Sequence, residues 1–460
     1  MPHPLLAYST DHSRPIWLVT EANWSKVAAE LPSAARSFAK AQGFDAKAGS
    51  HCLLPDAEGG LLGVVFGLDG EEARHVNPFL VGKLPTLLPE GVYRFETQAP
   101  DPSLAALAWL MGSYSFERYR KRPAKAVRLV VPRGVDGHEI ARIANAVAAS
   151  RDLVNTPTSD LGPDGIEAAS RQVADRHGAD FKSIVGDDLL RQNFPMIHAV
   201  GRASATPPRL VDITWGREDA PRITVVGKGV AFDTGGLDIK PSSSMLLMRK
   251  DMGGAAAALA LADMIMGAGL PVRLRVLIPA VENAISGNAF RPGDILHSRK
   301  GITVEIGNTD AEGRLILADA LALADEESPD LVVDFATLTG AARVALGPEL
   351  PPFFTDDDAL ADEVARHGRA VNDPVWRMPL WAPYQSQLDS KFADMNNTGG
   401  PLAGSITAAL FLRRFVSAAR AHVHFDIFAW NSTAKPGRPE GGEVQAARLM
   451  YALLKERYGS

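Results

Sequence analysis

The sequence predicts a two-domain α/β protein. A larger C-terminal domain would have a mostly parallel, twisted sheet flanked by helices, and a smaller N-terminal domain would also be α/β. The chain has 460 residues, and at about 150 residues per domain this length favours two or three domains. Hydrophobic residues make up 46% and charged residues 22%, as in globular proteins with a large core. Beyond residue 159, strand-like apolar runs alternate with helical patterns, the rhythm of βαβ units.

Residues 1–135 are assigned to the N-terminal domain. Gly63–Gly67 and Val127–Val131 are short apolar runs typical of strands, and Leu104–Arg120 has the pattern of an amphipathic helix. No residue cluster in this domain suggests chemistry, so its role is left open.

Residues 136–158 are expected to form a connecting helix and a linker. His138-Glu139 begins a zinc-protease His-Glu-x-x-His pattern, but Arg142 stands where the second histidine is required. The helix should span Gly137–Val154 and end before Pro157, because a residue that precedes proline disfavours helix.

Residues 159–460 are assigned to the larger domain. The expected strands are Pro195–Val200, Arg222–Val226, Arg273–Ile278, Ile302–Ile306, Leu331–Phe335 and His422–Phe428. The expected helices are Gly253–Gly267, Gly313–Glu327, Ser405–Ala419 and Val444–Tyr458. The long segment Gly347–Gly404, which contains several prolines and glycines, predicts one or two helices with loops that frame a site.

Charge and composition exclude several classes of protein. The net charge of −6 gives no electrostatic footprint for a general nucleic-acid binder. The single cysteine, Cys52, excludes an intrachain disulfide and cysteine-based zinc clusters. Met1–Trp17 lacks the apolar run of a signal peptide, and Gly253–Leu270, broken by Asp263, is too rich in alanine and glycine to span a membrane. We expect a cytoplasmic protein without a membrane segment.

The octapeptide Asn308–Leu315 is the most informative motif of the chain. It places the carboxylates of Asp310 and Glu312 two positions apart, with the cation of Arg314 two positions further on. An apolar run precedes it and a leucine- and alanine-rich run follows, which predicts a strand-to-helix turn, where open α/β sheets bind ligands. The alternative is a capping box in which Thr309 and Glu312 begin the helix.

Other charged residues stand at similar places. Lys228 and Asp233 lie in a glycine-rich turn after a predicted strand. This turn has Phe232 where a dinucleotide fingerprint needs its third glycine, and it lacks the Gly-Lys-Ser/Thr of a phosphate-binding loop. Lys240 precedes a proline, and Asp251 precedes a helix, for which a helix N-cap is the alternative.

Together these residues form a set of carboxylates and cations that could converge on one edge of the sheet. Four clustered carboxylates cannot all remain ionised without compensating cations. Lysines and an arginine supply part of the charge, and a pair of divalent metal ions about 3.5–4 Å apart would supply the rest. The sequence therefore favours a two-metal site over helix capping.

His422, His424 and Asp426 alternate along a predicted strand. They would share one face and could bind a metal ion. Histidines buried in a strand are the preferred interpretation, because the acidic cluster is the better site.

Five segments resemble the leucine aminopeptidase (cytosol aminopeptidase) family of dinuclear metallo-exopeptidases. They are Val226–Gly236, Ile239–Ser242, Met248–Ala256, Asn308–Leu315 and Ala336–Ala341. Weaker matches lie at Arg151–Pro157 and Gly404–Ala409. The resemblance covers the chain from about Asp152 onward and implies that residues 159–460 form the catalytic metallo-aminopeptidase domain. The N-terminal domain is similar to the family only in size and rhythm.

The resemblance implies two divalent metal ions per subunit, manganese or zinc. Asp233 and Glu312 would bridge both ions. Asp310 would complete one site, and Lys228 and Asp251 would complete the other. Lys228 would have to be neutral to bind a metal, and a nearby dication lowers an amine's pKa enough for that.

The resemblance also implies the catalytic roles. Lys240 would stay protonated and polarise the scissile carbonyl. Arg314 would hold a bicarbonate ion that acts as general base toward a metal-bridging water. The free amine of the substrate would bind one metal and Asp251, which explains the release of N-terminal residues only.

The side-chain pocket is implied as well. Its substrate-binding residues would be Met248, Asp251, Thr337, Leu338 and Gly340. Phe428 and Asn431 stand where better-known members carry smaller or apolar residues, which predicts a narrower or more polar pocket than one for leucine.

The implied partners are peptides with a free N-terminus and five further copies of the chain in a homohexamer. The alternatives are a DNA-binding regulator, because some bacterial members of the family also bind DNA, and a dipeptidase of narrow specificity for small peptides such as cysteinyl-glycine. The acidic net charge disfavours nucleic acid as a partner. A third alternative, a catalytically inactive scaffold, conflicts with the seven intact site residues.

Overall fold

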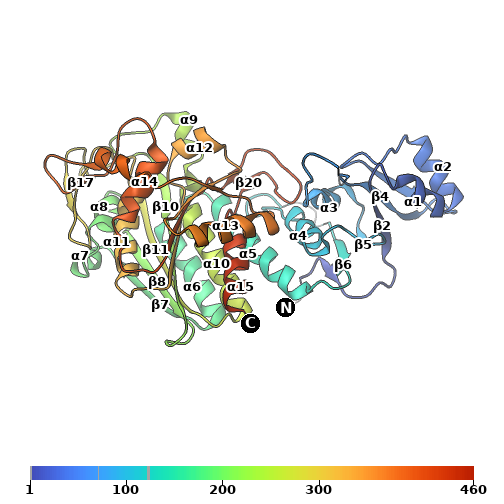
Figure 1. Ribbon diagram of the computed structural model, residues 1–460, viewed down its shortest axis with the longest axis horizontal. Helices are drawn as coiled ribbons and strands as arrows, with labels where there is room; N and C mark the ends of the chain where they lie inside the picture. Colours follow the sequence, from blue (N-terminus) through green and yellow to red (C-terminus); the bar gives the residue numbers. More distant parts are fainter. Residues whose placement is uncertain (1–2, 71, 122–124, 460) are drawn as a thin grey trace. The chain divides into compact units, whose positions relative to one another are not determined.

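The computed structural model describes residues 3–70, 72–121 and 125–459. The chain forms two compact units (Figure 1), one comprising Met1–Ala148 with Ser432–Glu440 and the other comprising Ala149–Asn431 with Gly441–Ser460. The short segment Ser432–Glu440, which the sequence placed with the larger domain, packs within the first unit. A Cβ atom on Gly82 would lie 2.7 Å from the carbonyl oxygen of Ala108 and would collide with the backbone of Gly437, so glycine permits this close packing.

The first unit contains a mixed sheet in which all pairs except β3–β4 are parallel. In order across the described sheet, its strands are β1 (Leu6–Ala7), β6 (Val127–Val130), β5 (Gly91–Phe95), β2 (Arg14–Val19), β4 (Leu61–Gly67) and β3 (His51–Pro55). Its helices include α1 (Trp24–Glu30), α2 (Ser33–Ala41) and α4 (Pro102–Gly112). α4 is shorter than the predicted Leu104–Arg120, because it ends at Gly112 and the hydroxyl of Ser113 donates to the carbonyl of Trp109.

The predicted connecting helix is α5 (Gly137–Asn155). Asp136 precedes it, and its side chain accepts hydrogen bonds from the backbone N–H groups of His138 and Glu139. The incomplete zinc-protease pattern is thus the start of a helix, as expected.

The second unit is built on a larger sheet whose central strands are parallel. In order across the described sheet, the strands are β16 (Trp376–Arg377), β15 (Pro352–Phe354), β18 (His422–Asp426), β14 (Leu331–Ala336), β9 (Arg222–Gly227), β11 (Arg273–Asn283), β8 (Arg209–Trp215) and β7 (Asp180–Val185). β10 (Gly229–Asp233) pairs in parallel with the far end of β11. The pairs β7–β8, β8–β11 and β15–β18 are antiparallel, and β16 is parallel to β15.

Helices cover both faces of this sheet (Figure 1). One layer contains α10 (Gly253–Ala268), α15 (Ala447–Tyr458), α6 (Pro163–His177) and α13 (Asp358–Ala370). The other contains α11 (Gly313–Asp325), α8 (Pro195–Gly201) and α14 (Gly404–Arg413). Leu315, Leu321 and Phe411 belong to the main core on this second side. The predicted α/β architecture with a mostly parallel sheet is confirmed.

One strand prediction was wrong, and another holds only in part. Pro195–Val200 is helix α8, since proline begins the helix and the backbone N–H groups of Met196 and Ile197 donate to the buried carboxylate of Asp319. Such a short, mostly apolar run does not distinguish strand from helix. Ile302–Ile306 is strand only at β13 (Thr303–Glu305), which pairs with β12 (Ile295–His297) and β17 (Met395–Asn396) outside the main sheet.

α10 is an internal helix. The segment Met248–Ala268 is long and apolar enough to cross a membrane by length and composition alone, but 83% of its most apolar window is buried inside the protein. A Cβ on Gly254 would lie 2.8 Å from the backbone nitrogen of Lys228. Small residues therefore let the helix approach the sheet closely.

Candidate metal centre

The charged residues predicted to form a site meet at the carboxyl ends of the central strands. Lys228 follows β9, Asp233 ends β10, and Thr337 follows β14. Because these strands are parallel, their carboxyl ends lie at one edge of the sheet, where ligands bind in open α/β folds. Asp251 is brought to the same place by the short 3₁₀ helix η2 (Met248–Met252), and Glu312 by the turn before α11.

Neither of the capping alternatives holds. Helix α11 begins at Gly313 after Glu312, and no side chain caps it; Thr309 instead donates its hydroxyl to the carbonyl of Gly235 at 2.7 Å. Helix α10 begins after Met252, also without a side-chain cap. The carboxylates of Glu312 and Asp251 are thus available for another purpose.

Lys228 lies at the centre of the buried carboxylates. Its Nζ is 3.0 and 2.9 Å from the two carboxylate oxygens of Asp251, 3.1 Å from Oε1 of Glu312 and 2.8 Å from the carbonyl oxygen of Thr337. A Cβ on Gly313 would lie 2.6 Å from this Nζ. The glycine of the octapeptide therefore makes room for the amine.

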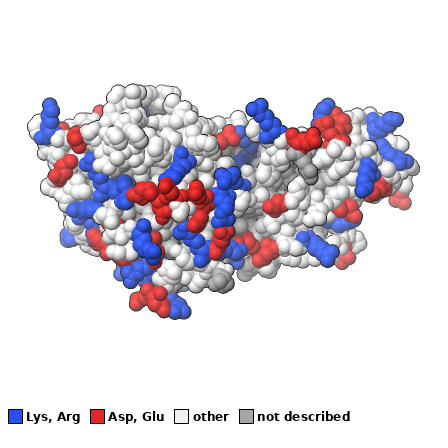
Figure 2. Space-filling model, viewed as in Figure 1, with Lys and Arg blue, Asp and Glu red and all other residues white. Residues whose placement is uncertain are grey.

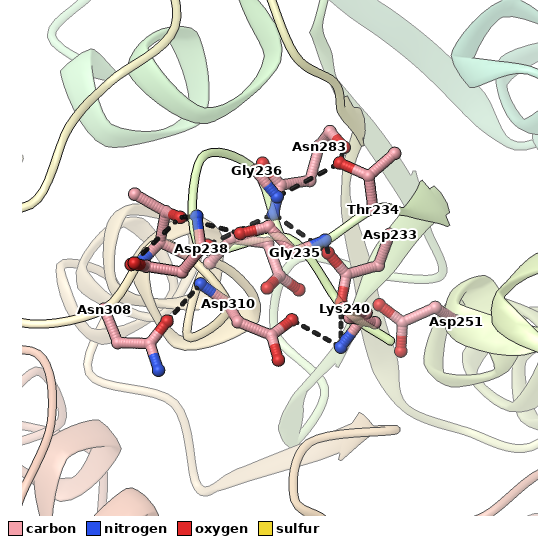
Figure 3. A network of polar contacts seen from close by, with 12 residues as sticks. Asp233, Thr234, Gly235, Gly236, Asp238, Lys240, Asp251, Asn283, Asn308 and Asp310 are labelled. Carbon is pink, nitrogen blue, oxygen red and sulfur yellow. Dashed lines mark hydrogen bonds and ion pairs between the residues drawn. The ribbon is translucent and has the colours of Figure 1, made fainter. Parts of the chain in front are cut away.

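Lys240 lies between the other two carboxylates (Figure 3). Its Nζ is 2.8 Å from Oδ2 of Asp233 and forms an ion pair with Oδ1 of Asp310. Oδ1 of Asp233 accepts hydrogen bonds from the backbone of Gly235 and from the side-chain amide of Asn283, each at 2.9 Å. Asp233 is therefore fixed from three sides.

The octapeptide turn is held by a residue far away in the sequence. Asn397, fully buried, accepts hydrogen bonds from the backbone N–H groups of Gly307 and Asn308 and donates to the carbonyls of Asn308 and Ala311. Its own carbonyl accepts from Nη1 of Arg314 at 2.6 Å. A lone asparagine has no local signature, so sequence analysis did not identify this residue or Asn283.

The pKa values of the site residues are shifted because several charged side chains lie close together. Burial, reinforced by the charge of Asp233, raises the pKa of Glu312 to about 8 and that of Asp310 to about 6. Burial opposes the charge of Lys228, but the carboxylates of Asp251 and Glu312 outweigh it and hold the pKa of Lys228 above its usual value. Without further cations, the fold cannot keep all its site carboxylates ionised.

The donor set fits divalent cations. One carboxylate oxygen from each of Asp233, Asp310 and Glu312 lies within 4.8 Å of the others. Among the residues that the structure describes, nothing donates a hydrogen bond to the buried Oδ2 of Asp251, Oδ1 of Asp310 or Oε1 of Glu312, although each lies within ion-pair distance of a lysine. Buried carboxylate oxygens without hydrogen bonds are costly, and a metal ion would satisfy them.

Arg314 lies behind the carboxylates in the first turn of α11. It is buried, and burial lowers the pKa of its guanidinium to about 10, so it stays charged. The part of the chain that the structure describes offers no hydrogen-bond partner to its Nε. Part of its donor capacity serves Asn397, and part remains available to an anion.

A cavity of about 310 Å³ opens beside the cluster. All five predicted substrate-binding residues line it: Met248, Asp251, Thr337, Leu338 and Gly340. Phe428 lines it as expected, whereas the amide of Asn431 donates to Glu443 at 2.7 Å.

Two further cations that sequence analysis missed, Lys250 and Arg343, also line the cavity. Burial lowers the pKa of Lys250 to about 8.

The loop after β14 is fixed by Asp426. Its Oδ1 accepts hydrogen bonds from the backbone N–H groups of Leu338 and Thr339, each at 3.2 Å, and its Oδ2 accepts one from the hydroxyl of Thr339 at 2.5 Å. Asp426 therefore shapes one wall of the cavity and is not grouped with the neighbouring histidines.

The histidines of β18 are buried and hold a carboxylate. Nε2 of His422 and Nδ1 of His424 lie 2.7 and 2.6 Å from the two oxygens of Asp334 on the neighbouring strand β14. This agrees with the interpretation of structural histidines.

Known proteins share both the sequence and the fold. Residues 148–451 match the model described as "Cytosol aminopeptidase family, catalytic domain". The chain belongs to the cytosol aminopeptidase family. Residues 14–132 match "M17 aminopeptidase, N-terminal domain", so the likeness to the family extends into the N-terminal domain, beyond size and rhythm.

Individual members of this peptidase family agree. A curated relative from Syntrophotalea carbinolica, named "Probable cytosol aminopeptidase", is 43% identical over 317 residues, which are 68% of this chain and 64% of the relative, just under two thirds of its length. The crystal structure of cytosol aminopeptidase from Coxiella burnetii has a TM-score of 0.94 and 44% identity and covers 99% of both chains. The bottromycin maturation enzyme BotP in complex with Mn has a TM-score of 0.87 and 32% identity, covering 97% of this chain and 99% of BotP. The predicted family is confirmed.

Proposed function

We propose that the protein is a metal-dependent aminopeptidase that releases N-terminal amino acids from peptides. The observation that carries this proposal is the group of four carboxylates beside a cavity. Asp233, Asp251 and Glu312 are buried, Asp310 is partly exposed, and within the described residues three of the four have an oxygen that accepts no hydrogen bond. Family membership supports the same reaction class.

The metal ligands in this proposal are Lys228, Asp233, Asp251, Asp310 and Glu312. They would hold two divalent ions, manganese or zinc, and the manganese complex of BotP supports this choice. When bound, the two ions supply Lewis-acid chemistry, activating water near neutral pH and polarising the peptide carbonyl. The free α-amine of the substrate would be received beside Asp251, which restricts cleavage to the N-terminal peptide bond.

Lys240 is proposed to act on the scissile carbonyl. It lines the cavity, and although burial opposes its charge, Asp233 and Asp310 keep its pKa above the usual value. A protonated amine at this position can donate to the carbonyl oxygen and stabilise the negative charge that develops there.

Arg314 is proposed to hold a bicarbonate ion as general base. The support is its buried, charged guanidinium, whose Nε has no hydrogen-bond partner, in the turn that also carries Glu312. Guanidinium groups bind planar oxyanions through paired N–H donors.

We further propose that the protein is a cytoplasmic homohexamer. The cytosolic names of its relatives support the location. Large apolar side chains stand out on the second unit, where Leu246, Val344 and Leu402 are 80%, 91% and 78% exposed, and contacts between subunits would bury them. A DNA-binding role gains no support from the face in Figure 2, where basic and acidic side chains are intermingled.

The test is hydrolysis of a leucyl chromogenic amide and of a panel of dipeptides by protein stripped of metal, before and after addition of Mn²⁺ or Zn²⁺. We expect activity to return with metal and to be absent for N-acetylated peptides. Lys240→Met should lower kcat by about 100-fold or more, as does loss of one oxyanion donor in other hydrolases. The matched control is Lys182→Met, since Lys182 is an exposed lysine on the edge strand β7.

Two outcomes would overturn the proposal. One is protein that binds two metal ions per chain, as measured by calorimetry, and yet hydrolyses no substrate with a free N-terminus. The other is equal cleavage of free and N-acetylated peptides.

A further inference from the structure

A buried lysine and a partly exposed arginine line the substrate cavity. Lys250 of η2 and Arg343 of α12 (Gly340–Leu346) both face the ring of Phe428. Nζ of Lys250 is 4.5 Å from the ring centroid, and Cζ of Arg343 is 5.7 Å from it. All three side chains line the same cavity as Asp251.

These cations outnumber the carboxylates that pair with them. Arg343 uses Nη2 to contact the carboxylate of Asp426 at 3.0 Å, but its buried Nη1 donates no hydrogen bond. Lys250 is only 6% exposed; its backbone N–H donates to the carbonyl of Leu247, but within residues 3–70, 72–121 and 125–459 its ammonium has no hydrogen bond or ion pair. The nearby carboxylate of Asp251 is already held by Lys228.

Metal loading would supply no further partner for Lys250 or for Nη1 of Arg343. Two divalent ions would balance the four site carboxylates, so Lys250 and Arg343 would not be needed to neutralise them. The contact with Phe428 compensates little, because a cation–π contact contributes about 1–2 kcal/mol, whereas an unpaired buried charge costs several kcal/mol. The cavity wall is therefore suited to an anionic ligand group.

The position of the cations indicates which part of the substrate they meet. Lys250 lies two residues after Met248, and Arg343 lies three residues after Gly340, on the same side of α12. Met248 and Gly340 are the proposed contacts of the N-terminal side chain, and they line the cavity together with both cations. A side chain that enters there would have the two cations within its surroundings.

We propose that this aminopeptidase preferentially releases acidic N-terminal residues, glutamate or aspartate, whose side-chain carboxylate is received by Lys250 and by Nη1 of Arg343. The proposal rests on the proposed aminopeptidase function and names its substrate class. A leucine side chain would fill the same space but leave Lys250 and Nη1 of Arg343 without a partner, and leaving buried polar groups unpaired is how a site rejects an analogue that lacks the matching group.

The decisive comparison is between glutamyl and glutaminyl substrates, because these side chains have nearly the same shape and differ in charge. We would measure kcat/KM for α-glutamyl, glutaminyl, aspartyl, asparaginyl and leucyl amides with the Mn²⁺-loaded protein at pH 7.5. We expect kcat/KM to be at least about tenfold higher for the acid than for its amide in one or both pairs, glutamyl over glutaminyl or aspartyl over asparaginyl, as for a close charge pair across an interface. Calorimetric binding of free L-glutamate and L-glutamine gives the same comparison without turnover.

Variants of Lys250 and Arg343 separate the effect of these two cations from that of the rest of the site. In Lys250→Met and Arg343→Met, the ratio of kcat/KM for the preferred acid to that for its amide should fall toward one. A general loss of activity does not affect this ratio, because both substrates are compared within one variant. Arg249→Met is the matched control: Arg249 is next to Lys250 but lies over Trp430, 5.1 Å from its ring centroid, and does not line the cavity. Its ratio should stay at the wild-type value.

The failures are distinguishable. No hydrolysis of any amide by metal-loaded protein would overturn the aminopeptidase function itself. Two other results would overturn the acidic specificity and leave the aminopeptidase function standing. One is hydrolysis of leucyl or glutaminyl amides with both acid/amide ratios at or below one. The other is an acid/amide ratio that is unchanged in both variants.

Discussion

Glu312→Gln should stabilise the metal-free protein at pH 7. The buried Glu312 has a pKa of about 8 in the fold against 4.5 for a free side chain, so between these values the folded state binds more protons than the unfolded state, and stability falls as the pH rises. At about 1.4 kcal/mol per pH unit, the penalty at pH 7 is about 3 kcal/mol. Glutamine has nearly the same shape as the protonated acid and does not ionise in the unfolded chain, so it removes the penalty.

The assay is urea unfolding of chelator-treated protein at pH 5 and pH 7.5. The relevant transition belongs to the unit that carries the site and is identified by its shift when Mn²⁺ is added to the wild type. The advantage of the variant should be small at pH 5 and grow toward pH 7.5, while Mn²⁺ should no longer stabilise it, since a ligand that binds only the folded state adds stability by mass action. Glu30→Gln, at an exposed position on α1, is the control and should show neither effect. A Glu312→Gln variant that is no more stable than wild type at pH 7.5 would refute the reasoning.

Three further predictions concern the support of the site. Gly313→Ala places a Cβ 2.6 Å from Nζ of Lys228 and should weaken Mn²⁺ binding by tenfold or more in calorimetry; unchanged affinity would contradict it. Asn397→Ala leaves four backbone groups of the octapeptide turn without partners and should lower the free energy of unfolding by about 3 kcal/mol; a loss under 1 kcal/mol in urea titrations would argue against it. Asp334→Asn removes the charge that, against burial, raises the pKa of His424. The stability that protonated His424 gains from Asp334 is fully present below pH 6.5 and is lost as the pH rises through the pKa of His424 in the folded protein. The variant should therefore be about 3 kcal/mol less stable at pH 6, with a smaller loss of stability at pH 9. An equal deficit at both pH values would contradict this.

The site residues that the sequence predicted are those that lie together in a short, recognisable motif. Asp310 and Glu312 share one octapeptide, and Lys228 and Asp233 share one glycine-rich turn, so their association needed only the rule that parallel strands end together. The contacts of Asn397 and Asp426 join segments more than 80 residues apart. No local pattern marks such residues, because any buried asparagine or aspartate has the same local sequence appearance.

The errors in the fold have a similar origin. Pro195–Val200 is apolar except for His198, and the distant carboxylate of Asp319, which accepts hydrogen bonds at the start of that segment, shows why it is helical. β7 and β8 were not predicted; they add to the sheet as antiparallel partners beyond the parallel centre. The predicted strand Ile302–Ile306 is right in type and wrong in its partners, since pairing depends on strands that come later in the chain.

The construction of the site from separate strand ends bears on when the protein gains its metal during synthesis. Its proposed ligands extend from Lys228 to Glu312, the carbonyl that contacts Lys228 comes from Thr337, and the loop after β14 is held by Asp426 at the end of β18. A chain still emerging from the ribosome cannot assemble this arrangement until almost all of it has been translated. A peptidase built in this way stays inert while it is unfinished, and its own newly made N-terminus, as well as those of neighbouring nascent chains, is not exposed to a partly made enzyme.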